Sequence, residues 1–356
     1  MSPKKTPSTT NVTIRDVAQL AGVSPATVSK VINDVPYVSA ETLARVRAAV
    51  EQLNYRPNSI ARSLKSSRTS TLGLITNDLE GVFTMSMMRG VEDVASAQGF
   101  SVMLCNSYGD PDRERAHLQV LLDKQIDGVI LLNGFRAHER GAPALPLGKV
   151  PVVYLYQYTH ALAVPSIIPD DFGGAVMGTK HLIACGHKRI GVINGPANYE
   201  ASHLRLAGYR QTLEAAGLTF NPTLVRAGKW YESSGYALTH ELMSLPEPPD
   251  ALFCMSDSLA VAAMSALRER GLRIPRDISV VGFDNRAFAQ HQTPPLTTIL
   301  LPLVEMGRLA GELLLRAIQT GEQTSELHRV PCEFIHRAST RLVASSFQGA
   351  GQHGNL

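Results

Sequence analysis

Residues 13–64 read TIRDVAQLAGVSPATVSKVINDVPYVSAETLARVRAAVEQLNYRPNSIARSL, and this stretch decides the structure of the N-terminal end of the chain. Thr13 with Asp16 three residues later is a capping-box start for a helix. Apolar side chains recur at helical spacing through residues 14–21 and predict one buried face. Gly22 ends this helix, because glycine readily takes the left-handed conformation of a C-cap. The stretch therefore begins with a short helix and a tight turn.

A second helix follows at once. Ser24 is a good N-cap residue, Pro25 suits the first helical position, and Val28 and Val31 lie on its apolar side. Two short helices joined by a tight turn are typical of a helix-turn-helix unit, whose second helix enters a DNA major groove; an ordinary helical hairpin is the alternative. The residues off the apolar face are small or hydrogen-bonding, as a groove-reading surface requires: Ser24, Pro25, Ala26, Thr27, Ser29, Lys30 and Asn33.

Residues 56–65, RPNSIARSLK, predict a further, marginal helix. Pro57 can open it, and Ile60, Ala61 and Leu64 share one face. The segment is too short to be a stable helix alone in water. It makes sense as a helix that folds only on DNA and places an apolar wedge in the minor groove. A plain linker helix is the alternative.

Charge is distributed unevenly along the chain of 356 residues, whose net charge is only +3. Residues 1–70 contain ten Lys and Arg against four Asp and Glu, whereas the remainder contains 24 against 27. This basic head on a mildly acidic body indicates a polyanionic partner for the head alone. The length predicts two or three structural units.

Several classes of protein are disfavoured by the composition. Four dispersed cysteines show no metal-ligand spacing, so we expect reduced thiols, no metal and no cofactor. Residues 1–11 are polar and basic rather than a signal peptide, and there is no transmembrane run. These features predict a cytoplasmic protein without a membrane partner. They also argue against a transport receptor.

From residue 72 onward, short apolar strands alternate with helical patterns in two series, which predict two similar α/β lobes with parallel sheets. The expected strands are 72–76, 102–106, 128–132, 150–155, 190–194, 224–227, 251–255 and 278–283. The expected helices are 85–98, 113–124, 174–185, 204–216, 233–244 and 259–270. We also expect the helix at 303–320 to return to the first lobe and a final strand at 330–335 to lie on the second.

Polar and aromatic residues follow the predicted strand ends, where ligands of such folds bind in the cleft between lobes. Structural roles are the alternative: Asp78 and Asp257 can cap helices, Arg205 can pair with a structural carboxylate, and Trp230 can belong to a core. The candidates are Asn77, Asp78, Phe83, Asp170, Arg205, Trp230, Asp257 and Asp284.

The chain resembles the lactose/galactose repressor (LacI/GalR) family of bacterial transcription regulators over nearly its full length. The matching segments are TIRDVAQLAGVSPATVSKVIN, VSAETLARVRAAVEQLNYRPNSIARSL, HLIACGHKRIGVINGP, RLAGYRQTLEAAGL, ALFCMSD, VVGFDN and TPPLTTI. The resemblance implies a homodimer with a small all-α head, a hinge helix and a two-lobe α/β body similar to type I periplasmic sugar-binding proteins. Double-stranded DNA with a palindromic operator is the implied partner of the head.

Carried over by position, the resemblance implies DNA contacts at Thr13, Ser24, Pro25, Ala26, Thr27, Ser29, Lys30, Asn33, Tyr37, Ser39, Asn58, Ala61 and Leu64. The phosphate contacts are Ser24, Thr27, Asn33 and Ser39, and the base-reading positions are Pro25, Ala26, Ser29 and Lys30. Leu64 matches the minor-groove wedge, with Asn58 and Ala61 beside it. Pro25 and Ala26 depart from the larger polar residues of other members, which leaves the operator sequence open.

The resemblance further implies effector contacts at Arg205, Trp230 and Asp284, with Phe83 and Asp78 behind them and Asp170 and Asp257 completing the set. Charged hydrogen-bonding groups beside an aromatic face are typical of sugar recognition. We therefore expect a small-molecule effector, a sugar or sugar derivative. Purine-type ligands and control by a protein partner are the alternatives.

Together these features predict an allosteric repressor. Effector binding would favour one angle between the lobes and thereby permit or prevent pairing of the hinge helices. A sugar-acting enzyme is disfavoured, because the sequence has no dinucleotide, phosphate-loop or nucleophile-elbow motif, and we predict no catalytic residues. The expected parts are a disordered tail (1–12), a helix-turn-helix domain (13–57), a hinge helix and linker (58–70), an effector-binding and dimerisation body (71–343; first lobe 71–168 plus 299–326, second lobe 169–298 plus 327–343) and a flexible tail (344–356).

Overall fold

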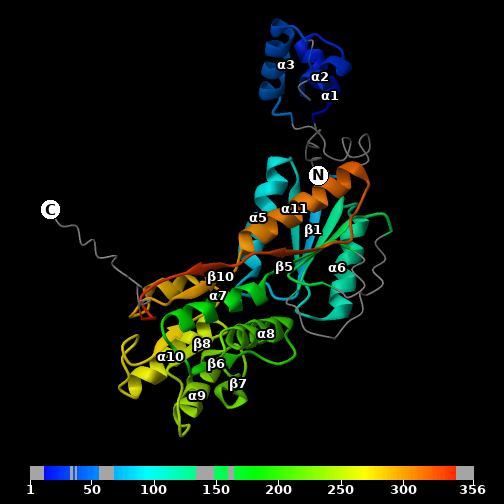
Figure 1. Cartoon of the computed structure of the whole chain (residues 1–356). Helices are drawn as coiled ribbons and strands as arrows, with labels where there is room; N and C mark the ends of the chain where they lie inside the picture. The colour runs from blue at the N-terminus through cyan, green and yellow to red at the C-terminus, as the bar shows by residue number, and fades with distance from the viewer. Residues whose placement is uncertain are drawn as a thin grey trace, which may run out of the picture. The chain divides into compact units, whose positions relative to one another are not determined.

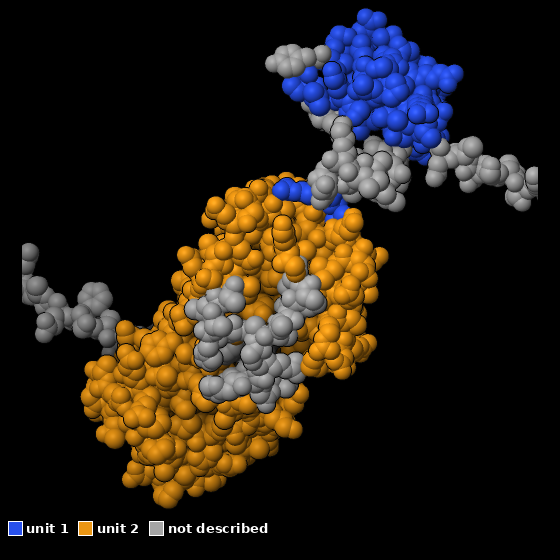
Figure 2. Space-filling view, turned by 90° about the vertical axis from the view of Figure 1, so that its right-hand side faces the viewer, with its two compact units in different colours: residues 1–69 blue, residues 70–356 orange. Residues whose placement is uncertain are grey.

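The computed structural model describes residues 12–32, 35–36, 38–55, 68–133, 148–158 and 164–341. The chain separates into two compact units, residues 1–69 and residues 70–356, and each is described by itself (Figure 2). Several predictions lie outside the described residues: the hinge helix, both terminal tails, Asn33, Tyr37, Asn58, Ala61 and Leu64.

The described part of the first unit contains three helices, and the first two lie where the sequence predicts them. They are α1 (Ile14–Ala21), α2 (Pro25–Ile32) and α3 (Ala40–Gln52). The capping box is present, since the carboxylate of Asp16 accepts the backbone N–H of Thr13 at 2.7 Å. Gly22 ends α1 with a left-handed φ of 65°. A small apolar core joins the three helices through Val17, Ala18, Ala21, Val28, Val31, Val46 and Ala49.

The first lobe of the second unit is built on a parallel sheet of six strands, in the order β11-β5-β4-β3-β1-β2. The strands are β1 (Thr71–Thr76), β2 (Ser101–Asn106), β3 (Gly128–Leu132), β4 (Val152–Leu155), β5 (Ser166–Pro169) and β11 (Leu327–Val330). The helices are α5 (Thr84–Ala97), α6 (Pro111–Asp123) and α11 (Leu303–Thr320). Helices α5 and α11 pack on one face and α6 on the other, so each face has its own apolar core.

Helices α5 and α11 lie side by side at close range (Figure 1). A Cβ at Gly90 would come within 2.0 Å of the carbonyl oxygen of Val304, and one at Gly307 within 2.0 Å of that of Met87. The two glycines therefore allow the helix backbones to touch. This contact confirms that the helix after residue 302 returns to the first lobe.

The second lobe is built on a parallel sheet of four strands, in the order β7-β6-β8-β9. Its elements are β6 (Ile190–Asn194), β7 (Val225–Ala227), β8 (Ala251–Cys254), β9 (Ser279–Val281), α7 (Asp171–Ala184), α8 (Glu200–Ala215), α9 (Glu232–Met243), α10 (Asp257–Glu269), and the short helices η1 (Pro222–Leu224) and η2 (Ala287–His291). Helices α7 and α8 cover one face and α9 and α10 the other. A two-stranded antiparallel ribbon, β10 (Thr298–Leu300) with β12 (Glu333–Ile335), packs on α7.

The structure corrects three details of the predicted lobes. Strand β5 was not predicted. Strand β11 pairs with β5 and so belongs to the first lobe, although residues from 327 onward were assigned to the second. Ile299 and Leu301 are buried in the core of the second lobe, so the chain returns to the first lobe after residue 301 rather than after 298. Strand pairing and core membership, neither visible in local patterns, decide these boundaries.

Among the residues that the structure describes, no helix is both long enough and apolar enough to cross a membrane.

Candidate functional site

Helix α2 carries the residues that the sequence analysis predicts to read a DNA groove. Val28 and Val31 are buried against the other two helices. Ser24, Pro25, Ala26 and Lys30 are exposed, and Thr27 and Ser29 are half-buried. Ser24 also caps α2, because its Oγ accepts the backbone N–H of Thr27 at 3.2 Å. The exposed side of α2 thus presents small polar groups and one cation outward, which suits close approach to a groove.

Two further predicted DNA contacts lie at helix starts. Thr13 and Ser39 are both exposed. Thr13 belongs to the capping box of α1, and Ser39 Oγ accepts the backbone N–H of Thr42 at the start of α3, over 3.3 Å. Helix N-termini carry unsatisfied N–H groups that attract phosphate, so both positions suit contacts to a DNA backbone.

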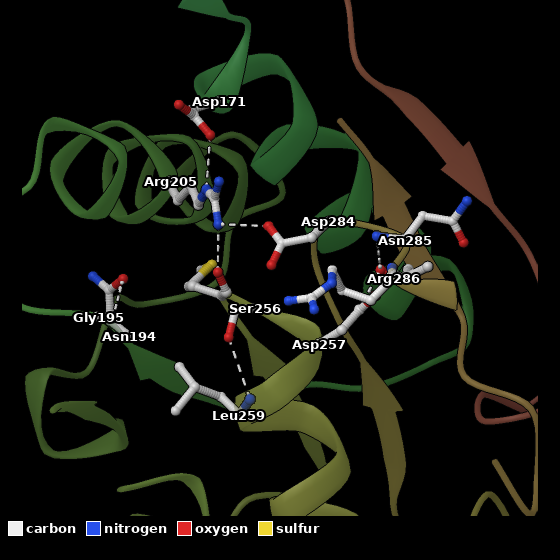
Figure 3. A network of polar contacts seen from close by, with 12 residues as sticks. Asp171, Asn194, Gly195, Arg205, Ser256, Asp257, Leu259, Asp284, Asn285 and Arg286 are labelled. Carbon is white, nitrogen blue, oxygen red and sulfur yellow. Dashed lines mark hydrogen bonds and ion pairs between the residues drawn. The ribbon is translucent and has the colours of Figure 1, made fainter. Parts of the chain in front are cut away.

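The second unit has a buried arginine at the centre of its polar network. Arg205 of α8 is only 2% exposed. Its Nε donates to Asp171 Oδ1 over 2.8 Å, its Nη1 lies 3.5 Å from Asp284 Oδ1, and Nη1 also donates to the carbonyl oxygen of Met255 (Figure 3). The carboxylates come from the start of α7 and from the loop after β9, so three elements meet at one guanidinium.

Aromatic rings enclose this guanidinium. The centroid of the Phe283 ring lies 3.7 Å from Arg205 Cζ, and that of Trp230 lies 5.7 Å from it. Tyr199 meets Trp230 edge-on, with the centroids 6.1 Å apart. The indole lies directly over Gly195, where a Cβ would come within 2.1 Å of it. Cation–π attraction grows when the cation is desolvated, so these rings help to hold the guanidinium in place.

Burial governs the ionisation of the network. It raises the pKa of Asp284 to about 8, an effect that Arg205 opposes and that the neighbouring carboxylates of Asp257 and Asp171 increase. Burial likewise raises the pKa of Asp171, although Arg205 lowers it. Burial alone would lower the pKa of Arg205, but the two carboxylates outweigh it and the pKa is raised. The guanidinium of Arg205 therefore faces two carboxyl groups, those of Asp171 and Asp284. At neutral pH the carboxyl group of Asp284 holds a proton.

Asp257 holds the loop that carries Asp284. It is fully buried at the first position of α10, and its two carboxylate oxygens accept the Thr298 hydroxyl and the Arg286 backbone N–H, each over 2.6 Å. Burial raises its pKa to about 6. The backbone of the loop is unusual, with φ of 108° at Asp284 and 53° at Asn285. Because both oxygens of Asp257 are engaged by the protein, its place is that of a positioning residue.

Aromatic residues of the first lobe reach the same region. Phe83, the N-cap residue of α5, packs against the apolar cores of both lobes, and its ring lies 5.8 Å from that of Tyr156. Tyr156 directly follows β4 with a left-handed φ of 60°. Burial raises the pKa of Tyr156, and the nearby charges of Asp171 and Arg205 also act on it. We call the region formed by Phe83, Tyr156, Asp171, Arg205, Trp230 and Asp284 the lobe junction.

Only some of the predicted effector residues thus lie together in the lobe junction. Phe83, Arg205, Trp230 and Asp284 belong to the lobe junction. Asp170 instead caps α7, since its Oδ1 accepts the Gly173 N–H at 2.9 Å, and it is the next residue, Asp171, that meets Arg205. Asp78 is exposed, and its backbone bonds to Thr76 and Thr84 of its own lobe.

Two residues of the lobe junction, Tyr156 and Asp171, were missed from the sequence. The strand-end rule that selected Asp78 would also have found Tyr156, had it been applied to β4. No local signal distinguishes Asp171 from Asp170, because only the path of the chain after β5 decides which carboxylate turns toward Arg205.

Comparison with known proteins gives the same division into a head and a body. Residues 13–58 match the model of bacterial regulatory proteins of the lacI family, and residues 179–340 match a periplasmic binding protein-like domain. The HTH-type transcriptional repressor PurR of Haemophilus influenzae strain PittEE is 37% identical over 336 residues, which cover 93% of this chain and 99% of the relative. The chain belongs to the LacI family of bacterial transcription regulators. The PurR of Aliivibrio salmonicida is 35% identical, with the same coverage of both chains.

Solved structures of LacI-family members have the same architecture. The lac repressor dimer bound to operator and the anti-inducer ONPF superposes with a TM-score of 0.79 at 29% identity, covering 93% of this chain and 99% of that one. A complex of the regulator CelR with cellobiose gives 0.66 at 32% identity, covering 92% and 99%. The predicted fold class is confirmed, and the LacI-family chain is a DNA-binding repressor with an effector-binding domain, not an enzyme.

Proposed function

We propose that this repressor binds a palindromic operator as a homodimer and that a small molecule at the lobe junction controls this binding. The observation that carries the proposal is Arg205, buried between two carboxyl groups and two aromatic rings where the lobes meet. Such a cluster offers donors, acceptors and flat apolar faces to one ligand. Since its target is operator DNA, we expect the protein to act in the bacterial cytoplasm.

A purine-type effector has the stronger support. The curated relatives at about 36% identity are PurR repressors, which are purine-responsive. A planar heterocycle suits Phe83 and Trp230, which offer aromatic rings from opposite lobes. Arg205 and the protonated Asp284 can both donate hydrogen bonds to acceptor nitrogens at its ring edge. In this proposal Arg205, Trp230, Asp284 and Phe83 contact the effector and Asp257 positions the loop.

A sugar is the second candidate, supported by a different observation. CelR, at 32% identity, is described in complex with cellobiose. Carboxylates paired with a guanidinium also suit vicinal hydroxyls. The two classes differ in what they need from Asp284: hydroxyls can donate to a carboxylate, whereas a ring nitrogen acceptor needs the protonated form.

Operator binding measured by fluorescence anisotropy tests the proposal. A palindromic duplex selected from a random library is titrated with the full-length protein, with and without adenine, guanine, hypoxanthine, glucose, galactose and cellobiose. We expect one class to shift the operator affinity by about 1–3 kcal/mol, the usual size of allosteric coupling. Asp284→Ala should abolish the shift but leave effector-free operator binding intact.

The control lies on the same helix as Arg205. Arg210→Ala removes an exposed arginine that pairs with Glu214 one turn on and should leave the response unchanged. If no compound shifts operator affinity, and only a cellular protein does, the body answers to a protein partner and the proposal is wrong. Leu64→Ala tests the wedge separately, since it should weaken operator binding with or without effector.

A further inference from the structure

Each α-helix of the second lobe begins with an acidic residue. Asp171, Glu200, Glu232 and Asp257 are the first residues of α7, α8, α9 and α10. Helices α8, α9 and α10 follow the parallel strands β6, β7 and β8 of the second sheet, so their N-termini lie at the edge of that sheet where ligands bind. Helix α7 follows β5 of the first sheet, and its first residue reaches the same region through Arg205. A helix N-terminus otherwise attracts anions through its dipole and its N–H groups. A carboxylate at each start opposes that attraction.

Three of these helix starts are tied to the lobe junction by contacts of the acidic residue or of its chain neighbour, and the fourth, that of α9, follows Trp230 closely in sequence. Asp171 bonds to Arg205. Glu200 follows Tyr199, whose ring meets Trp230, and Glu232 lies two residues after that tryptophan. Asp257 accepts the N–H of Arg286, two residues after Asp284. Asp171, Glu200 and Asp257 therefore lie at or beside one site, and Glu232 opens the helix that follows Trp230.

At the starts of α7 and α10, backbone N–H groups are already bonded to side chains of the protein. Asp170 accepts the Gly173 N–H of α7 at 2.9 Å. Ser256 Oγ accepts the Leu259 N–H of α10 at 3.2 Å (Figure 3). At α8 and α9 no side chain caps the helix, but Glu200 and Glu232 occupy the first turn. An incoming anion would thus meet either a satisfied donor or a carboxylate.

The hydrogen-bond donors of the Arg205 guanidinium, at the centre of the lobe junction, are also occupied by groups of the protein itself. Arg205 donates to Asp171 and to the Met255 carbonyl and lies 3.5 Å from Asp284. The other charges that act on this cluster are the carboxylates of Asp170, Glu200 and Asp257 and the guanidiniums of Arg286 and Arg337. Carboxyl groups outnumber guanidiniums among these described residues even when the protonated Asp284 is left out, so the field at the site disfavours negative charge.

The first lobe supplies no compensating cation among the residues described directly after its strands. Those residues are Asn77, Ser107, Asn133, Tyr156, Asp170 and Pro331. Arg329, inside β11, acts on Tyr158 but is itself exposed to solvent. The nearest lysine after a strand of the second lobe, Lys229, is exposed.

We propose that the lobe junction takes an uncharged effector, a neutral base, nucleoside or sugar, and excludes its phosphorylated or carboxylated relatives. The inference rests on the proposed function, because it presupposes a small molecule at this site. It names a property on which the purine and sugar candidates agree, and it separates a nucleobase from a nucleotide and a sugar from a sugar phosphate.

Isothermal titration of the full-length protein with matched pairs tests this. The pairs are adenine with adenosine 5′-monophosphate, guanine with guanosine 5′-monophosphate, glucose with glucose 6-phosphate, and galactose with galactose 1-phosphate, all at low ionic strength, where charge effects are least screened. In any pair with a binder, the neutral member should bind at least about tenfold more tightly. An anionic member that binds as tightly as its neutral partner overturns the inference but leaves the proposed function standing. If neither member of any pair binds, the proposed function fails with it.

Charge-reversed variants supply the second measurement. Glu232→Lys places a cation at the start of α9, at an exposed position outside the proposed contact residues. It should raise the affinity of the anionic member severalfold and change that of the neutral member less than about twofold. Glu241→Lys makes the same change near the other end of α9, at an exposed residue, and should alter neither. An unchanged neutral-to-anionic ratio in Glu232→Lys contradicts the inference.

Discussion

Arg205 Nη1 and Asp284 Oδ1 lie 3.5 Å apart, with both side chains buried, and the same guanidinium bonds to Asp171 on its other side. A buried ion pair such as that of Arg205 with Asp171 is weak evidence for stability as a whole, because desolvation offsets the attraction. Removing only one member is costly, since the other charge is then left without compensation. The network should therefore be sensitive to single substitutions.

Arg205→Ala should lower the free energy of unfolding of the second unit by about 3–5 kcal/mol, because it strands two buried carboxyl groups. Trp230 is the only tryptophan of the chain and lies beside Arg205, so urea unfolding followed by its fluorescence reports on this unit. Arg210→Ala on the same helix breaks only an exposed pair and should cost less than about 1 kcal/mol. Equal losses of unfolding free energy in the two variants would show that the buried network stabilises the fold no more than an exposed ion pair does.

Asp284→Asn should change the pH dependence of stability. The folded-state pKa of Asp284 is raised to about 8 by burial, so between about pH 4 and pH 8 the folded chain holds a proton that the unfolded chain has lost. Its contribution to stability therefore falls as pH rises through this window. Asparagine stays neutral, so the variant should gain about 1 kcal/mol or more over the parent between about pH 5 and pH 8.5.

Asp277 provides the control, because its contribution to stability should change with pH in the opposite direction. Hydrogen bonds from Arg273 lower its pKa to about 2, so the carboxylate favours the folded state above the unfolded pKa of about 4 and that benefit is lost as pH falls toward 2. Asp277→Asn should be less stable than the parent across neutral pH, by an amount that does not vary there. A pH-independent difference for Asp284→Asn as well would exclude a raised pKa at that residue.

Tyr158→Phe should loosen the contact between the two lobes. The Tyr158 hydroxyl donates to Glu200 Oε1 over 3.3 Å, and these residues follow β4 of the first lobe and open α8 of the second. Losing one half-exposed hydrogen bond should cost only about 0.5–1.5 kcal/mol. We expect a larger relative effect on effector affinity, measured by calorimetry, than on unfolding. Tyr236→Phe, which removes a hydrogen bond to Glu269 inside one lobe, should leave effector affinity unchanged.

Gly22→Ala should destabilise the head. No atom lies within 4 Å of a Cβ built at this position, so the effect isolates the left-handed φ of 65°. A left-handed conformation costs an L-residue about 1–2 kcal/mol, and asparagine tolerates it better. Amide hydrogen exchange in α1 and α2 of the full chain should therefore speed up in Gly22→Ala and less in Gly22→Asn. Unchanged protection in both would contradict the assigned turn.

Local patterns in the sequence were sufficient for most elements of this fold. The capping box at Thr13, the turn at Gly22 and the N-cap at Ser24 each depend on residues within one helical turn, and all three are present in the structure. The apolar strands 128–132 and 190–194 were predicted with the bounds that β3 and β6 have. Such features need only short-range sterics and periodic burial, which a linear sequence carries in full.

Only the tertiary structure decided which carboxylates share Arg205 and where the lobes exchange strands. Asp170 and Asp171 are chemically alike neighbours, and the turn from β5 into α7 directs one to cap the helix and the other to the guanidinium. Strand β11 joins β5 across more than a hundred residues of intervening chain, a pairing that no local pattern encodes. The physical reason is the same in both cases, because long-range packing sets the direction of a side chain and the neighbour of a strand, while the sequence sets only their local conformations.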